Sequence, residues 1–162
     1  MSEINIQQAI RDSLQTEKDA MDFYSLCAKQ VADPKAKQFF EVLAREEREH
    51  AEHFYRIYEG GDIASFDDFM DAPPDHESEW LRLFRRVRSD FSEAKAMKLA
   101  LDKEKMLEKV HLRSAEKFDD PEVKGIYQLN ARETRNHYEQ IEAEYMRVMG
   151  MMDENDAAFF RE

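Results

Sequence analysis

The sequence predicts an all-α protein, a four-helix bundle made of two helical hairpins joined by a long crossover connection. Good helix formers such as Glu, Lys, Ala and Leu dominate the composition, while only 4 of the 162 residues are Gly and 4 are Pro. These breakers stand between long uninterrupted segments. Within the segments, apolar residues recur every three or four positions, as they do on one face of a helix. The length suggests a single domain with a substantial core.

The first hairpin is expected to cover about residues 3–59. Residues 3–32 contain no Gly or Pro and are predicted to form one helix. Asp33-Pro34 has the pattern of an N-cap followed by proline at the first helical position, so a second helix is predicted from there. Gly60-Gly61 is expected to end it.

The crossover connection is expected to span residues 60–91. It is acidic and aromatic at first, contains Pro73-Pro74, and then has a short amphipathic segment from Trp80 to Val87. The helices on either side should be about 40 Å long, at 1.5 Å per residue. The connection is long enough to run the length of such a bundle. An exposed apolar stripe around Trp80 and Phe84 would suit the interface of a homodimer.

The second hairpin is expected at about residues 92–149, which completes a bundle domain over residues 1–150. Ser92 can cap a helix that runs to about Phe118. Asp120-Pro121 repeats the signal of the first hairpin, and a last helix should follow to about Gly150. Residues 151–162 form an acidic C-terminal tail. Its Phe159-Phe160 pair would dock on the bundle or a partner subunit, or the tail would be disordered.

Charge and cysteine content exclude several classes of function. The chain has 24 Lys+Arg and 36 Asp+Glu, a net charge of −12, so we expect no nucleic acid and no anionic membrane as a partner. The single Cys27 excludes a disulfide framework and any Cys-rich metal cluster. No signal peptide and no membrane-spanning run is apparent. The expected location is the cytoplasm.

An internal repeat relates the two hairpins. Pro34 and Pro121 are 87 residues apart, and sliding the chain by 87 makes 15 of the 50 pairs from residue 9 to 58 identical without a gap. The identical pairs include Glu17 with Glu104 and His50 with His137. Duplication would place equivalent residues around a pseudo-twofold axis, so polar residues on the inner face of one half should meet their copies.

Five polar residues fall in the apolar stripes of the four predicted helices, where they should point toward the bundle axis at similar heights: Glu17, Glu47, His50, Glu104 and His137. Several carboxylates buried together must be protonated, pair with Lys or Arg, or bind a cation. The stripes offer no Lys or Arg at this level. A metal ion is the economical answer, and carboxylate plus imidazole suits iron, manganese or zinc.

These residues resemble the rubrerythrin-like branch of the ferritin-like di-iron carboxylate superfamily. The likeness rests on Glu17 with Tyr24 seven residues later, on Ala44–Phe54 with its Glu47-x-x-His50 motif, and on Glu104 with His137. It implies a ferritin-like bundle whose core di-iron site reduces peroxide, reacts with oxygen, or oxidises and stores iron. By this resemblance the metal ligands would be Glu17, Glu47, His50, Glu104 and His137, and the three carboxylates would serve in catalysis.

The second half departs from the family pattern. Thr134 stands where the second Glu-x-x-His motif has its Glu, and Leu107 and His111 stand where another Glu and a Tyr are usual. Glu108 could substitute as a ligand, whereas Glu133 should point roughly 100° away from the axis. The four-Cys module of full rubrerythrins is absent from the sequence, which implies a separate electron donor.

These departures leave alternatives open. A mononuclear site, or one strong and one weak metal position, would follow from the missing carboxylate. The protein would then be an iron-handling or a zinc- or iron-binding protein without turnover, or an interaction protein whose site has decayed. His111 is expected to be a hydrogen-bond partner in the core. Tyr24 is either packing or a donor to a carboxylate.

Overall fold

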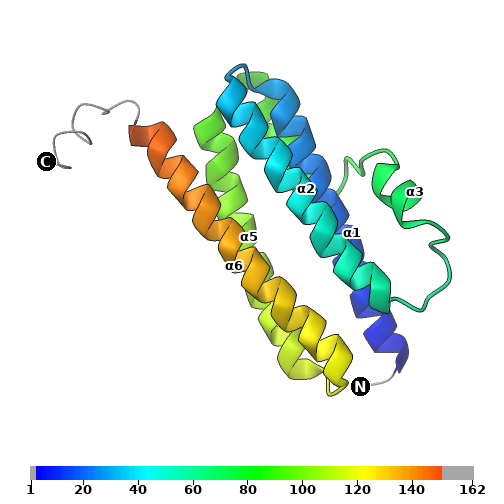
Figure 1. Ribbon diagram of the computed structural model, residues 1–162. Coiled ribbons are helices and arrows are strands. Elements are labelled where there is room, and N and C mark those ends of the chain that lie inside the picture. The colour runs from blue at the N-terminus through cyan, green and yellow to red at the C-terminus, as the bar shows by residue number, and fades with distance from the viewer. Residues whose placement is uncertain (1–2, 151–162) are drawn as a thin grey trace, which may run out of the picture.

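The computed structural model describes residues 3–150, and its four long helices form a bundle (Figure 1). The long helices are α1 (Glu3–Gln30), α2 (Pro34–Ile57), α5 (Glu93–Lys117) and α6 (Pro121–Gly150). The connection between α2 and α5 contains α3 (Phe66–Asp71), α4 (Glu79–Val87) and a 3₁₀ turn at Arg88–Asp90. No strand occurs in residues 3–150, so the all-α bundle is confirmed. The same residues include no helix long and apolar enough to cross a bilayer.

Capping side chains fix where three of the long helices begin. The Asp33 carboxylate accepts a hydrogen bond from the Ala36 amide at 3.3 Å, and the Ser92 hydroxyl accepts one from the Lys95 amide at 3.1 Å. Asp120 accepts from the Val123 amide at 3.2 Å. Each cap satisfies an amide that has no partner within its own helix. The repeated Asp-Pro signal therefore starts the second helix of both hairpins.

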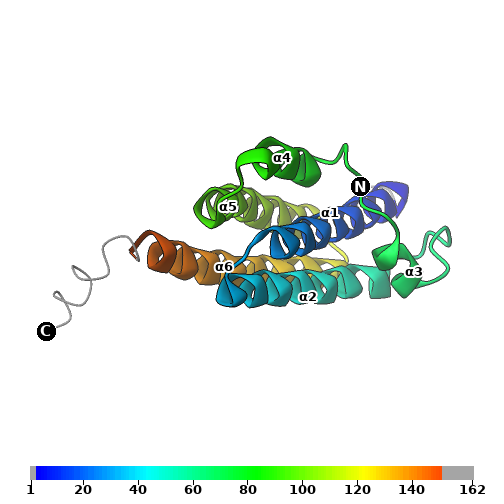
Figure 2. The same ribbon diagram turned by 90° about the horizontal axis from the view of Figure 1, so that it is seen from above.

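The two hairpins lie side by side, and α4 lies across α1 and α5 on the side away from α2 and α6 (Figure 2). Trp80, Leu81 and Phe84 of α4 are all buried. The Trp80 ring lies 5.2 Å from that of Phe23, between ring centroids. The expectation of an exposed stripe for a homodimer is therefore wrong at this place, because the stripe packs on the chain's own bundle. The C-terminal tail at 151–162 lies outside the described residues.

A buried ion pair fastens the connection to α1. Lys18 Nζ lies 2.6 Å from the Asp22 carboxylate and 3.0 Å from the carbonyl oxygen of Ala72, and both charged side chains are almost fully buried. Asp19 is buried beside them, and its carboxylate accepts a hydrogen bond from Gln15 at 2.9 Å. Burial raises the pKa of Asp19 from 3.8 to about 6, against the opposing effect of the Gln15 bond.

Asp19→Asn is expected to stabilise the protein at pH 7 but not at pH 4. The folded protein holds the Asp19 proton up to about pH 6, whereas the unfolded chain releases it near 3.8. The contribution of Asp19 to the free energy of unfolding therefore falls as the pH rises from 3.8 to about 6. Thermal midpoints at both pH values measure the effect, with a gain of a few degrees expected at pH 7. The exposed Asp12→Asn on the same helix is the control, and an equal gain in both variants would contradict the argument.

Candidate metal centre

The core of the bundle contains a cluster of five polar side chains, one or two from each long helix. Glu17, Glu47 and Glu104 are completely buried, and His50 and His137 are 3% and 1% exposed. They come from α1, α2, α5, α2 and α6 respectively. The structure therefore brings together all five residues that the helical stripes indicated.

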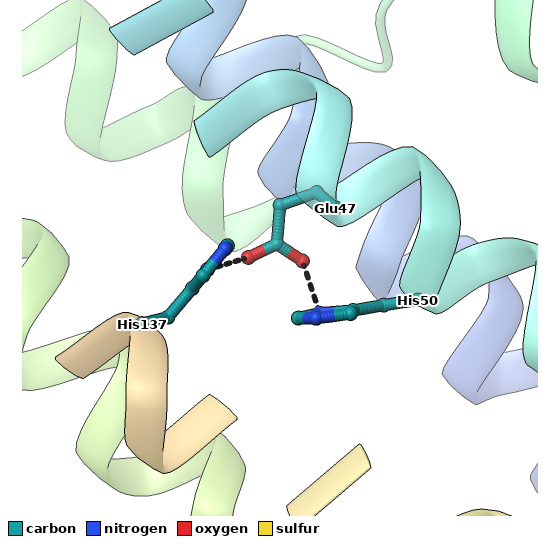
Figure 3. A group of neighbouring side chains, drawn as sticks. All are labelled: Glu47, His50 and His137. Atoms are coloured by element: carbon teal, nitrogen blue, oxygen red, sulfur yellow. Dashed lines mark ion pairs between the residues drawn. The ribbon is translucent and has the colours of Figure 1, made fainter. Parts of the chain in front are cut away.

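Glu47 lies at the middle of the cluster, between the two imidazole rings (Figure 3). Its Oε1 is 2.9 Å from Nδ1 of His137, and its Oε2 is 3.4 Å from Nδ1 of His50. One ligand atom from each of these residues lies within 4.8 Å of the others. Glu17 Oε2 is 3.8 Å from His50 Nδ1, and Glu104 Oε1 is 3.5 Å from His137 Nδ1. The cluster thus divides into two sets, each of one carboxylate and one imidazole, which share Glu47.

The outer nitrogen of each ring is held by a glutamate from the other hairpin. His137 Nε2 donates to Glu46 at 2.5 Å, and His50 Nε2 lies 3.0 Å from Glu133. Such contacts fix the ring orientation of metal-binding histidines, here with Nδ1 toward Glu47. The sequence analysis gave no role to Glu46 and placed Glu133 away from the axis. Their spacing of 87 residues, the same as that of the two histidines, was the signal that could have found them.

The two single carboxylates are held in the same crossed way. The Tyr24 hydroxyl donates to Glu104 Oε1 at 2.7 Å, and His111 Nε2 donates to Glu17 Oε1 at 3.0 Å. Tyr24 and His111 are also related by the 87-residue repeat. Each residue leaves Oε2 of its carboxylate without a hydrogen bond. Tyr24 is thus a donor to a carboxylate as well as a packed side chain, and His111 is the expected core hydrogen-bond partner.

Two positions of the second hairpin do not supply carboxylates to the cluster. Glu108 is only partly buried and lies 3.8 Å from Arg135, so the structure does not bring this spare candidate to the other five. Thr134 is completely buried, and its hydroxyl has no hydrogen-bond partner. Leu107 is a buried apolar side chain. The cluster therefore has three carboxylates and two imidazoles.

When no cation is bound, burial and neighbouring charges favour protons on several side chains of this cluster. Burial and the charges of Glu104 and Glu17 raise the pKa of Glu47 well above its usual value. Burial alone would raise the pKa of Glu17, but its contacts with Glu47, His111 and His50 bring that pKa well below its usual value. Burial opposes protonation of His137, yet the Glu47 charge and its carboxylate contacts raise its pKa to about 12. A bound cation would take the place of these protons.

The donor atoms that face the centre fit a metal ion. Six are buried without a hydrogen bond of normal geometry: Glu17 Oε2, Glu47 Oε1 and Oε2, Glu104 Oε2, and Nδ1 of both His50 and His137. Buried polar atoms are rarely left in this state, and an ion coordinated by them accounts for all six at once. Mixed carboxylate and imidazole donors suit iron, manganese or zinc.

An acidic opening about 180 Å³ in volume connects the cluster with the surface between α2 and α6. His50 and His137 line its inner end, and Glu46, Glu49 and Glu133 line its sides. Three carboxylates around a small opening attract cations and repel anions. This face therefore suits the entry of a metal ion.

Tyr24→Phe is expected to weaken metal binding by about tenfold without unfolding the protein. The variant keeps the buried ring but frees Glu104 Oε1, so the carboxylate loses the contact that fixes its orientation. Isothermal titration with Zn²⁺ or anaerobic Fe²⁺ measures the change. Tyr138→Phe, on the outer part of α6, is the matched control. Equal affinities in the two variants would show that the Tyr24 hydroxyl has no such role.

The chain matches one protein-family description. The family model described as Rubrerythrin covers residues 8–145, which include all the residues of the cluster. No curated protein and no solved structure matches the chain.

Proposed function

Because this chain belongs to the rubrerythrin family, we propose that it is a di-iron protein that reduces peroxide in the core of its bundle. The observation that carries the proposal is the group of six buried donor atoms without hydrogen bonds. The residues that would hold the metal are Glu17, Glu47, His50, Glu104 and His137. Manganese or zinc would fit the same donors.

Two metal positions would share Glu47. The Glu17 and Glu104 carboxylates lie 3.8 and 3.5 Å from His50 and His137, and these two rings lie 3.4 and 2.9 Å from Glu47. Glu17 and His50 would therefore complete one position, and Glu104 and His137 the other. Iron bound there would supply the two electrons for reduction of hydrogen peroxide, a reaction that takes up two protons and gives two waters.

The chain's own residues would orient the donors and keep bulk water out. Tyr24 and His111 hold the two outer carboxylates by one oxygen each, and Glu46 and Glu133 hold the two rings. Thr134 has no carboxylate, so the second hairpin would offer the metal one acidic donor fewer than the first. Protons displaced from Glu47 and the two histidines would leave when metal binds.

The reaction would need an electron donor and a reducing compartment. A separate protein would supply electrons to the centre, since the sequence contains a single cysteine, Cys27, and no four-Cys module. A reducing compartment such as the cytoplasm suits a free thiol and ferrous iron alike.

Thr134 favours a second candidate function. With only three carboxylates, the centre would hold a single zinc or iron ion firmly and perform no turnover. The protein would then bind or transfer metal rather than reduce peroxide.

Anaerobic reconstitution with Fe²⁺, followed by stepwise addition of hydrogen peroxide, tests the proposal. We expect about two irons per chain and complete oxidation by about one peroxide per iron pair, since each peroxide takes two electrons. Oxidation is followed by absorbance, and iron by elemental analysis. One tightly held zinc that iron does not replace would support the second candidate. Less than about 0.3 metal per chain would contradict both, because each needs its donors occupied.

A further inference from the structure

A second opening lies on the opposite face of the bundle and ends at His111, which hydrogen-bonds to Glu17 of the centre. It is a pocket of about 340 Å³ between α1 and α5, next to the place where α4 lies across them (Figure 2). Its volume lies within the range of about 300–1,000 Å³ that is usual for small-molecule sites. Neither this pocket nor a larger hollow of about 480 Å³ between α1 and α2 includes any of the five residues of the centre. The pocket differs in that His111, which lines it, hydrogen-bonds to Glu17.

The pocket has an apolar wall and a polar inner end. Trp80, Met106, Leu107 and Val110 provide the wall, and Met106 and Val110 are 60% and 47% exposed at its mouth. On the other side are Ser13, His111 and Tyr127, with the Ser13 and Tyr127 hydroxyls 2.8 Å apart. Such a surface suits a molecule with an apolar body and one hydrogen-bonding end.

His111 links this pocket with a carboxylate of the centre. It lines the pocket and is 1% exposed, and its Nε2 donates to Glu17 at 3.0 Å. Its Nδ1 is buried without a hydrogen-bond partner. A buried ring nitrogen in this state indicates a partner that the protein itself does not supply.

The two openings differ in chemistry. The opening between α2 and α6 is about half as large and is lined by Glu46, Glu49 and Glu133, which suits a cation. The pocket between α1 and α5 is also lined by Asp12, Glu79 and Lys103, but Lys103 lies 2.7 Å from Glu79 and offsets its charge. This pocket therefore attracts cations less than the opening with three carboxylates does. An uncharged organic molecule would gain there from burial of its apolar surface.

We propose that the pocket between α1 and α5 binds organic hydroperoxides as substrates, with the organic group against Trp80 and Val110 and the –OOH end at His111. This inference rests on the proposed peroxide reduction. The O–O bond of ROOH breaks, one oxygen stays on the product alcohol ROH, and the other leaves as water. Two electrons come from two ferrous ions, which become ferric, and two protons are consumed.

Trp80 gives a direct measurement of binding, because it is the only Trp of the chain and lines the pocket. The protein as purified is titrated with 2-phenyl-2-propanol, the alcohol product of cumene hydroperoxide, and Trp fluorescence is followed. A saturable change is expected. Val110→Asp places a charge on the apolar wall and should weaken binding at least about tenfold, since apolar contact is exchanged for a charge. Leu112→Asp is the matched control, because Leu112 is also 47% exposed on α5 but does not line the pocket.

Peroxide reduction is then compared for the two variants after loading with Fe²⁺. The ratio of the rate with cumene hydroperoxide to the rate with hydrogen peroxide should be at least about fivefold lower in Val110→Asp than in Leu112→Asp. Equal ratios, or no saturable fluorescence change in the unmodified protein, would overturn the inference while leaving the proposed function intact. If neither peroxide oxidises the loaded protein, the proposed function fails and the substrate assignment fails with it.

Discussion

Glu47→Gln is expected to abolish metal binding at the centre and leave the metal-free protein folded. Glu47 lies between the two rings, and both metal positions would depend on its two oxygens. Gln offers one neutral oxygen, so affinity should fall by more than about a hundredfold, the upper range for loss of a supporting contact alone. Burial and the charges of Glu104 and Glu17 raise the pKa of Glu47 and so favour its neutral form without metal, which the neutral amide of Gln resembles.

The measurement combines metal content with thermal stability. Metal-free Glu47→Gln should unfold within a few degrees of the metal-free original, whereas the stabilisation by added Fe²⁺ or Zn²⁺ should disappear. Glu41→Gln is the control, since Glu41 is an exposed residue of the same helix. If Glu47→Gln retains full metal content, then Glu47 is not a shared ligand and the proposed centre is wrong.

Thr134→Glu is expected to affect the metal-free and the metal-bound protein in opposite directions. Thr134 is completely buried, and a longer acidic side chain there should destabilise the metal-free bundle by about 2–4 kcal/mol, through crowding and burial of a charge. With metal bound, a fourth carboxylate would neutralise more of the positive charge. We expect affinity to rise by about tenfold or more, equal to about 1.4 kcal/mol.

Thr134→Gln separates the effect of a larger side chain at this position from the effect of a negative charge. It crowds the core to the same extent, so it should destabilise the metal-free protein without improving metal affinity. Calorimetric titration and thermal unfolding of both variants give the two quantities. Equal metal affinity in Thr134→Glu and Thr134→Gln would show that a carboxylate at this position does not reach the metal.

The sequence predicted the fold well because the signals for it are local. Asp33-Pro34, Ser92 and Asp120-Pro121 act within one turn of the helices they start, and their caps are seen in the structure. The α3 helix at Phe66–Asp71 was not anticipated, since six residues are too few to show a helical period. The stripe around Trp80 was read as an interface because sequence periodicity shows that a face is apolar without showing what covers it.

The centre was predicted in part. The helical period brought out Glu17, Glu47, His50, Glu104 and His137, because a polar residue in an apolar stripe can be seen from the sequence. Glu46 and Glu133 lie outside those stripes and reach the rings of the facing hairpin with long side chains. The contacts between the two hairpins depend on how far one hairpin is shifted along the other. The spacing of residues within a single helix does not specify that shift. The roles of these residues in binding metal stay a prediction.

The crossed contacts of the centre have an evolutionary consequence. Tyr24 serves Glu104 and His111 serves Glu17, so neither hairpin completes its own half of the site. A symmetric dimer of a single hairpin would carry every mutation in both halves at once. A fused pair can change one copy alone, and the pairs Tyr24 with His111 and Glu47 with Thr134 are differences of this kind. Fusion of the two copies thus allows the two halves of the cluster to become unequal while Glu47 stays in place between them.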